Sequence, residues 1–517
     1  MTIPTRKIGA NQMARGTETA FDARIERETK LVPGPEFELS DLAALVPGTT
    51  ARHLPPLDLE AIYFDTHDLA LIRAGITIRH RTGDGAPTWT LKLPTGERSG
   101  GLVRRELDIE GPRGRRPRQL AVAVGAHLRG RRLIPVAEIH TVRNRVVIED
   151  DEGHELVEVA HDLVTAVRGR HLLGSWEEIE VESRGEDQGA AAQAAVVRSL
   201  RKAGCAKAPA VPKVVRGLGV AAGAPPEVTV PALPRRPTVA ALTRRALARS
   251  VVQVLAHDPA VRVGDDPEDL HQLRVGIRRL RSDLRTFRDF LDAGTTVHLR
   301  SELRWIADLT NELRDLDVLR AWLRAEEIVL PAEDRTAVDV LVRRADDQAD
   351  RHRRDLLRAM GSPRYGTLIH ELVELVTAPA AGVEGSERRA CKHLERQVQR
   401  RWDALVAELA ALEAEPGDAQ LHRARIAAKR CRAAVEAVEP LHRGDEPRLA
   451  RSLAALQDDL GAAHDAAVIE TWLRKAADSS AAFVAGELAV VAQIEGRTHV
   501  DRWPAAWAKA RRRRSAR

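Results

Sequence analysis

The sequence predicts a multidomain α+β protein. An N-terminal eight-stranded antiparallel β tunnel or barrel with flanking helices is followed by an all-α helical bundle with an internal two-fold repeat. Three observations predict this. Short alternating segments fill residues 21–206, a Pro-rich stretch covers residues 207–238, and helical periodicity fills residues 239–510. A chain of 517 residues is also too long for one ordinary core.

The composition narrows the classes of protein. Hydrophobic residues are 44% and charged residues 30%, which is typical of a folded soluble chain. Aromatic residues are only 3%, and we find no groove-reading motif, so we expect no nucleic-acid partner. No stretch approaches the ~20 apolar residues that span a bilayer. The three cysteines are far apart, which fits a reducing compartment. We therefore expect a cytoplasmic protein with no membrane partner.

The two ends of the chain differ from the rest. Residues 1–20 are polar and aperiodic, which predicts a disordered leader, and they contain no apolar run of signal-peptide length. Residues 511–517 form a basic tail. A solvated helix end and an anion contact are both open interpretations of this tail.

The first domain, residues 21–206, carries the strand pattern. Gly, Pro and Asp clusters separate the alternating segments. The expected strands cover residues 23–31, 59–65, 75–81, 88–93, 102–110, 139–148, 155–163 and 176–182. Helices are expected near residues 40–46, 117–128 and 190–203. Eight such strands favour a closed antiparallel barrel.

Alternation places charged side chains together on one face of each strand. In the first strand Glu26, Glu28 and Lys30 share one face, because successive side chains point to opposite sides. Five more strands repeat this pattern, each backed by aliphatic residues. Their charged sets are Arg79 with Arg81, Lys92, Arg104 with Glu106 and Asp108, Arg143 with Arg145, and Glu178 with Glu180 and Glu182.

These charges have a chemical pattern of their own. A solvated surface predicts random signs and many lysines, whereas here arginine dominates and acids recur in pairs. Arginine offers a rigid fork that suits phosphate oxygens, and paired carboxylates suit Mg²⁺ or Mn²⁺. The pattern therefore predicts a tunnel that binds a polyanion together with a metal ion.

The first domain resembles the CYTH domain, the triphosphate tunnel metalloenzyme superfamily, over about residues 20–205. The resemblance rests on a Glu-x-Glu-x-Lys motif at residues 26–30 and on the segments 63–66, 78–81, 90–92 and 178–182. It implies an eight-stranded tunnel, dependence on a divalent metal and substrates with a triphosphate-like tail. These include inorganic triphosphate, nucleoside triphosphates, thiamine triphosphate and, in one branch, ATP that is cyclised to cAMP.

The resemblance also implies roles for single residues. Three residues of the motif, Glu26, Glu28 and Lys30, are the expected catalytic residues. The expected metal ligands are Glu26, Glu28, Glu106, Glu180 and Glu182. The expected phosphate ligands are Lys30, Arg79, Arg81, Lys92, Arg104, Arg143 and Arg145.

Three positions stay open at this stage. Arg105 would replace Arg104 inside the tunnel if a β-bulge intervenes. Asp108 stands where the family often has a glutamate. Asp162 is either a further acidic tunnel residue or a residue of a turn or the surface.

The helical half, residues 239–510, contains an internal repeat of about residues 239–375 and 385–510. The motif His-x-x-Arg-x-x-x-Arg-Arg-x-Arg at residues 271–281 recurs at residues 422–432, 151 positions later, with Lys429 in place of the first Arg of the pair. Residues 313–318 recur at residues 463–468, at an offset of 150. In this second match His464 replaces an arginine and Ala467 replaces an aspartate.

Helical geometry puts the repeated basic residues on one stripe. At ~100° per residue, His271, Arg274, Arg278, Arg281 and Arg285 lie in line, and leucines occupy the opposite face. Such a row repels itself unless it binds anions. The adjacent Arg279 and Arg430 lie ~80° away from the stripe.

This half resembles the CHAD domain, the conserved histidine α-helical domain, over about residues 239–510. The resemblance implies a two-fold pseudo-symmetric bundle whose basic face binds inorganic polyphosphate. The residues expected on this face are His271, Arg274, Arg278, Arg281, His422, Arg425, Lys429 and Arg432. For the two histidines a hydrogen-bonded core role and a direct anion contact are both open.

Together the domains predict a metal-dependent inorganic triphosphatase or polyphosphatase, with Mg²⁺ or Mn²⁺ as cofactor. Its expected partners are inorganic triphosphate, polyphosphate and, by extension, polyphosphate granules. Two alternatives stay open: a non-catalytic protein that binds or targets polyphosphate, and a tunnel-type adenylate cyclase.

Overall fold

The computed structural model describes residues 22–35, 37–39, 48–95, 102–184, 187–235, 237–328, 330–378, 387–413, 416–439, 446–476 and 481–515. The expected leader at residues 1–20 and the expected helix near residues 40–46 lie outside these ranges. The chain divides into two compact units. One contains Met1–Leu120 and Arg132–Ala224, and the other contains Ala121–Arg131 and Pro225–Arg517.

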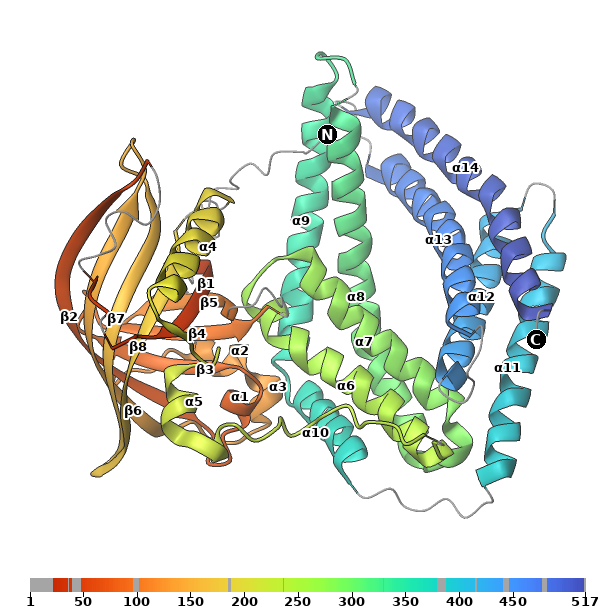
Figure 1. The fold of residues 1–517 in the computed structure, drawn as a ribbon. Coiled ribbons are helices and arrows are strands. Elements are labelled where there is room, and N and C mark those ends of the chain that lie inside the picture. The colour runs from red at the N-terminus through yellow and green to blue at the C-terminus, as the bar shows by residue number, and fades with distance from the viewer. Residues whose placement is uncertain are drawn as a thin grey trace. The chain divides into compact units, whose positions relative to one another are not determined.

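The first unit is a closed antiparallel barrel, which confirms the predicted fold class (Figure 1). Its strands are β1 (Asp22–Val32), β2 (Thr50–Asp65), β3 (Thr77–Thr82), β4 (Thr88–Pro94), β5 (Leu102–Glu110), β6 (Ile134–Glu149), β7 (Glu155–Arg168) and β8 (His171–Ser183). They are ordered β5-β4-β3-β2-β6-β7-β8-β1, and pairing of β1 with β5 closes the ring. A short strand, β9 (Ala206–Lys207), is added to β1.

The barrel is charged inside and apolar outside. Glu26, Glu28 and Lys30 of β1 are buried, whereas Ile25, which precedes them on the opposite face, is 44% exposed. Most aliphatic residues of the outer face pack under helices. Helix α4 (Asp187–Lys202) covers one apolar group with Val196 and Leu200, and α5 (Lys213–Leu218) covers another.

A buried carboxylate explains the Tyr-Phe-Asp-Thr segment at the end of β2. Asp65 accepts hydrogen bonds from the backbone N–H groups of Thr66, Leu71 and Ile72 at 2.6, 2.9 and 2.8 Å. It thereby fixes the short helix α1 (Ala70–Arg73) at the end of the strand. The motif residue Asp65 is structural.

The structure shortens the expected linker at residues 207–238. Residues 207–224 belong to the barrel unit. They contain β9, α5 and a 3₁₀ turn, η2 (Gly219–Ala221). The apolar residues Val214 and Ala222 pack against the barrel, which explains the difference, because a free linker would leave them in water.

The second unit is all-helical, as predicted. Its main helices are α6 (Val239–Val263), α7 (Pro267–Thr286), α8 (Ala293–Glu327), α9 (Arg335–Met360), α10 (Pro363–Thr377), α11 (Glu387–Ala410), α12 (Asp418–Val438), α13 (Glu446–Ala476) and α14 (Ala482–Ser515). A 3₁₀ turn, η3 (Arg288–Phe290), follows α7. Helix α14 includes residues 511–515, so these residues of the expected tail are helical. Two short helices, α2 (Arg118–Ala123) and α3 (Gly125–Leu128), complete the helices of the described residues.

The predicted repeat corresponds to equivalent helices. The first basic motif lies on α7 and the second on α12, and these two helices contact each other. Helix α7 begins with Asp266 as its N-cap, whose side chain accepts a hydrogen bond from the N–H of Glu268 at 2.9 Å. The apolar residues Leu273, Ile277 and Leu280 face one core, and Cys431 of α12 lies in a second core.

Candidate functional site

The barrel encloses a cavity of about 200 Å³ that is lined mainly by charged side chains. Ten basic and seven acidic side chains line it. All of the tunnel residues selected from the sequence are among them: Glu26, Glu28, Lys30, Arg79, Arg81, Lys92, Arg104, Glu106, Arg143, Arg145, Glu180 and Glu182. Further charged residues there are Arg24, Asp84, Glu158, Arg184 and Lys213.

The inner charges form ion pairs across neighbouring strands. Lys92 Nζ lies 2.5 Å from Glu26 Oε1 and 3.2 Å from Glu106 Oε1. Arg104 Nη2 lies 3.0 Å from Glu28 Oε1. Lys30 Nζ donates to Glu178 Oε1 at 2.8 Å. The interior is therefore a lattice of alternating charge.

Several buried arginine N–H donors of the tunnel are not used by these ion pairs. Among the described residues, the buried Nε atoms of Arg79, Arg81, Arg104 and Arg145 have no hydrogen-bond acceptor. Buried donors are normally paired. The Nε of Arg184, which also lines the cavity, is likewise buried without an acceptor in the described part of the chain, so five such guanidinium groups are suited to an anion with several oxygens.

The acidic residues divide into two groups by their pKa. Burial raises the pKa of Glu28, with Lys30 opposing and the charges of Glu180 and Glu26 adding to the rise. Burial raises the pKa of Glu182 to about 7, against the effect of Arg184. Glu28 and Glu182 face each other in the β1–β8 pairing, and Glu182 also faces Glu158 of β7. The negative charge of this row is only partly compensated: Arg104 pairs with Glu28, and Arg184 lies 2.6 Å from Glu158 and 3.4 Å from Glu182.

Glu180 and Glu106 belong to the other group. Although burial opposes it, the charges of Lys213 and Lys30 hold the pKa of Glu180 well below its usual range. Lys92 and Arg79 likewise outweigh burial and lower the pKa of Glu106. These two predicted metal ligands already have cationic partners.

Among the charged lining residues that the sequence did not indicate, Lys213 has the most acidic contacts. Its Nζ, on α5, lies 2.9 Å from Asp162, 3.0 Å from Glu178 and 2.5 Å from Glu180. These three carboxylates are close enough together to hold a metal ion. The lysine ammonium serves this group as its cation. A single lysine in a Pro-rich segment gave no signal of this role.

The structure also resolves the positions left open above. Arg104 is buried and pairs with Glu26 in register, with no bulge between β1 and β5, so Arg105 is not the inward residue. Asp162 is fully buried and accepts from Arg143 Nε at 2.8 Å. Asp108 accepts from Thr90 Oγ1 at 2.7 Å and is not among the residues around the cavity.

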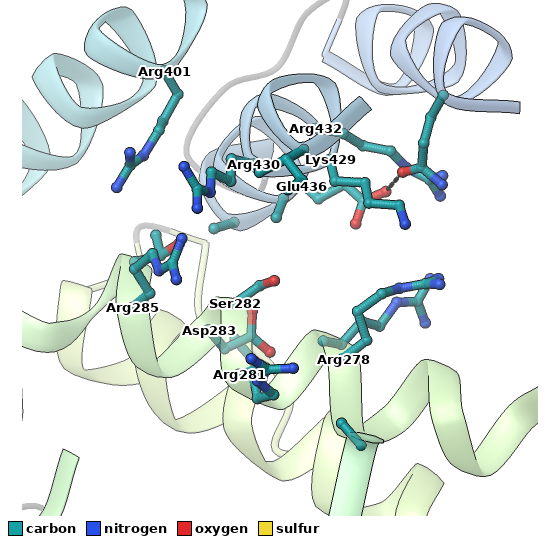
Figure 2. A pocket seen from close by; sticks show the side chains of 18 of the residues that line it. Arg278, Arg281, Ser282, Asp283, Arg285, Arg401, Lys429, Arg430, Arg432 and Glu436 are labelled. Atoms are coloured by element: carbon teal, nitrogen blue, oxygen red, sulfur yellow. Dashed lines mark hydrogen bonds and ion pairs between the residues drawn. The ribbon is translucent and has the colours of Figure 1, made fainter. Parts of the chain in front are cut away.

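A second cavity, of about 560 Å³, lies in the helical unit and is strongly basic (Figure 2). We call it the basic cavity. Twelve Arg and Lys side chains and three acidic side chains line it. Figure 2 shows Arg278 and Arg285 on α7 across from Lys429 and Arg430 on α12.

Seven of the eight residues predicted for this face line the basic cavity: Arg274, Arg278, Arg281, His422, Arg425, Lys429 and Arg432. The eighth, His271, is not among the residues described around the cavity. Its Nδ1 is buried and has no partner within the described parts of the chain. The pair left off the stripe, Arg279 and Arg430, does line the cavity.

Other helices add basic residues that the repeat motif did not indicate. Arg245 and Arg249 come from α6 and Arg401 from α11. The helical periodicity of each segment shows its faces but not which face meets α7 and α12. Only tertiary structure brings these residues together.

Crowding of like charge has a measurable consequence. Burial and the neighbouring Arg425, Arg278 and Arg274 lower the pKa of Lys429 to about 7. Burial and Arg274 lower the pKa of Arg278 to about 10. A bound polyanion would relieve this repulsion.

Within the described residues, no helix is long and apolar enough to cross a membrane.

Comparison with known proteins agrees with this geometry. The CYTH domain model matches residues 24–213 and the CHAD domain model matches residues 245–474. The uncharacterized protein Rv2226 of Mycobacterium tuberculosis is 33% identical over 371 residues, which are 68% of this chain and 69% of the relative.

Solved structures are similar to each part of the chain. The CHAD domain from the plant Ricinus communis is 26% identical with a TM-score of 0.47, and the match covers 55% of this chain and 95% of that one. HpAC1 from Hippeastrum, an adenylyl cyclase candidate described as having a dominant triphosphatase activity, is 20% identical with a TM-score of 0.23. That match covers 37% of this chain and 94% of HpAC1.

The chain thus combines a closed tunnel of interleaved charges with a basic helical bundle. Both cavities have the arginine-rich lining that suits phosphate groups. The chain belongs to the family of proteins that combine a CYTH domain with a CHAD domain.

Proposed function

We propose that this protein is a metal-dependent hydrolase of inorganic triphosphate or polyphosphate whose helical unit binds polyphosphate. The observation that carries the proposal is the tunnel lining, in which ten basic side chains surround a cavity of about 200 Å³ together with seven acids. CYTH proteins are typically metal-dependent phosphoryl-transfer enzymes, which supports the same reaction class.

The basic residues of the tunnel have a clear chemical task. Hydrolysis of a phosphoanhydride requires neutralisation of charge on the transferred phosphoryl group and an aligned water. Arg79, Arg81 and Arg145 have buried Nε donors that are available to phosphate oxygens. They would hold the chain extended along the tunnel.

The acidic row is the best place for a cation. Burial raises the pKa values of Glu28 and Glu182, and single arginine partners only partly compensate these carboxylates; Glu26 and Glu158 adjoin them. These oxygen donors fit Mg²⁺ or Mn²⁺. A divalent cation held there would supply charge neutralisation and a more acidic bound water. Glu106 and Glu180, paired with cations, would orient Lys92 and Lys30 toward the phosphate chain.

The basic cavity would bind the polyphosphate chain outside the tunnel. Its twelve basic side chains exceed its three acids, unlike the nearly balanced tunnel. This excess favours a ligand with many charges. The cytoplasmic location, and an association with polyphosphate granules, stay predictions from the sequence.

A substrate panel tests the proposal. The full chain is incubated with triphosphate, long-chain polyphosphate or ATP, with Mg²⁺ or Mn²⁺, and phosphate and cAMP are measured. Phosphate from triphosphate or polyphosphate supports the proposal. Formation of cAMP would favour the cyclase instead, and binding without turnover of any substrate would favour a non-catalytic binder.

A further inference from the structure

A shallow groove of about 500 Å³ adjoins the basic cavity and differs from it in chemistry. Ala467, Val468 and Trp472 of α13 form its apolar part. The polar residues that line the groove include His422, His464 and Lys475. The groove thus offers aromatic and aliphatic surface where the cavity beside it offers guanidinium groups.

The groove and the basic cavity are continuous. His422 and His464 line both of them, and their ring centroids lie 5.2 Å apart. Burial and the adjacent Arg425 lower the pKa of His464, which favours the neutral form of its ring. A ligand could therefore place anionic groups in the cavity and an uncharged planar group in the groove.

The internal repeat shows that this groove is particular to the second copy. Trp472 corresponds to Trp322 of the first copy, and each indole N–H donates to the helix beside it at 2.7 Å, to Gln348 Oε1 and Glu495 Oε2 respectively. The tryptophan is therefore kept in both copies. Trp472 is partly buried against the helical core, and the part of it that stays accessible lines the groove.

The residues around the two tryptophans differ. Ala467 corresponds to Asp317 in the first copy, which lies 3.6 Å from Arg320, and Arg320 in turn lies 2.5 Å from Asp346. His464 corresponds to Arg314. Replacement of these charged residues in the second copy produces neutral aromatic surface at the edge of an anion site.

We propose that the helical unit binds nucleoside oligophosphates, with the phosphate chain in the basic cavity and the nucleobase in the groove against Trp472 and His464. The inference rests on the proposed binding of phosphate chains by the basic cavity. Nucleobases of every kind stack on aromatic side chains, so we expect the groove to favour ligands that carry a base without distinguishing one base from another.

Photocrosslinking of the full chain tests this site directly. The probe is 8-azidoadenosine triphosphate in EDTA, which prevents metal-dependent hydrolysis, and labelled peptides are mapped. We expect label on α13 near residues 464–475. ATP should displace it at about tenfold lower concentration than inorganic triphosphate does, because only ATP gains the stacking interaction.

Ala467→Asp restores the first-copy residue and does not alter the lining of the basic cavity. It should abolish the advantage of ATP, so calorimetry should show a larger loss of affinity for ATP than for inorganic triphosphate. Trp472→Leu should have the same effect, and thermal melting checks its fold. Absence of label from α13, equal competition by ATP and triphosphate, or an unaltered Ala467→Asp variant would overturn the inference.

A separate control distinguishes failure of the proposed polyphosphate binding from failure of the nucleobase groove. If Arg274→Ala with Arg425→Ala leaves calorimetric binding of inorganic triphosphate and long-chain polyphosphate unchanged, the basic cavity is not a phosphate site. The proposed role of the helical unit then fails, and this inference fails with it. If that binding is lost but ATP has no advantage, only the inference about the groove fails.

Discussion

Lys213 shows how one residue can determine the charge balance of a site. Its ammonium contacts Asp162, Glu178 and Glu180. Although burial opposes it, the charge of Lys213 helps to lower the pKa of all three carboxylates. Because the folded pKa values of these carboxylates are lowered, they stabilise the fold above their unfolded pKa of about 4. That stability is lost as pH falls through the folded values.

We therefore predict that Lys213→Met destabilises the barrel at pH 7.5. Removal of one partner from a buried ion pair costs roughly 3–5 kcal/mol, or roughly 6–20 °C in melting temperature for a unit of this size. The difference from the wild type should shrink as pH falls toward 3, since the carboxylates then take up protons. Differential scanning fluorimetry across pH measures this. Lys207→Met, at an exposed position of β9, is the matched control; equal losses for both variants would contradict the assignment.

Lys429 provides a prediction about binding and pH. Its pKa of about 7 means that it loses its proton as pH rises from 6 to 8.5 in the free protein. A polyanion binds the protonated form better, so affinity for long-chain polyphosphate should fall by about tenfold over this range. In Lys429→Arg the guanidinium stays charged and most of this dependence should vanish.

Fluorescence anisotropy with labelled polyphosphate at each pH gives the comparison. Lys509→Arg, exposed on α14, should behave like the wild type. A Lys429→Arg profile that follows the wild-type profile would show that Lys429 does not titrate in the cavity.

At the scale of the element, the strand pattern was the most informative part of the sequence. Alternation with a period of two is a local property, so the faces of β1 and β5 could be assigned before their partners were known. Six strands with charged faces then indicated a charged interior. The position of α5 could not be predicted in this way, because the contacts of Lys213 join residues far apart in sequence.

The helices show the same limit. The duplicated motif on α7 and α12 identified most of the basic cavity. It did not indicate Arg249 or Arg401, which reach the cavity from α6 and α11. It also favoured His271, which the structure places outside the lining. The rotation of ~100° per residue places side chains on a stripe of one helix, but it does not specify which neighbouring helices face that stripe.

We predict that the two equivalent arginines of α7 and α12 act together. Arg274→Ala with Arg425→Ala should weaken polyphosphate binding at least about tenfold, because the loss of even one hydrogen bond to a charged group lowers affinity by about that factor. Arg423→Ala is the control, because Arg423 lies on α12 but is exposed and pairs with Glu408 at 3.5 Å. Equal affinities of the double variant and the control would contradict the assignment of the cavity.

At the scale of the whole molecule, the division of the chain is discontinuous. Ala121–Arg131, which separates β5 from β6 in sequence, belongs to the helical unit. There Ala126 is buried in the core, and His127 Nε2 lies 3.0 Å from the carbonyl oxygen of Leu255. The sequence predicted a helix in this region but placed it with the barrel, because contiguity in sequence was the only guide.

Residues 225–517 expressed alone should therefore be less stable than the helical unit in the full chain. The fragment lacks Ala126 and exposes the apolar surface that it covers. Calorimetry should show the helical transition at lower temperature in the fragment. Identical transitions in both proteins would show that residues 121–131 contribute no stability.

The central claim is that the tunnel cleaves phosphoanhydride bonds. The most direct measurement is phosphate release from inorganic triphosphate with Mg²⁺ or Mn²⁺, for the wild type and for Glu26→Gln with Glu28→Gln. We predict metal-dependent release by the wild type and a loss of at least about 100-fold in the double variant, with polyphosphate binding by the basic cavity retained. No release by the wild type, or undiminished release by the double variant, would contradict the account.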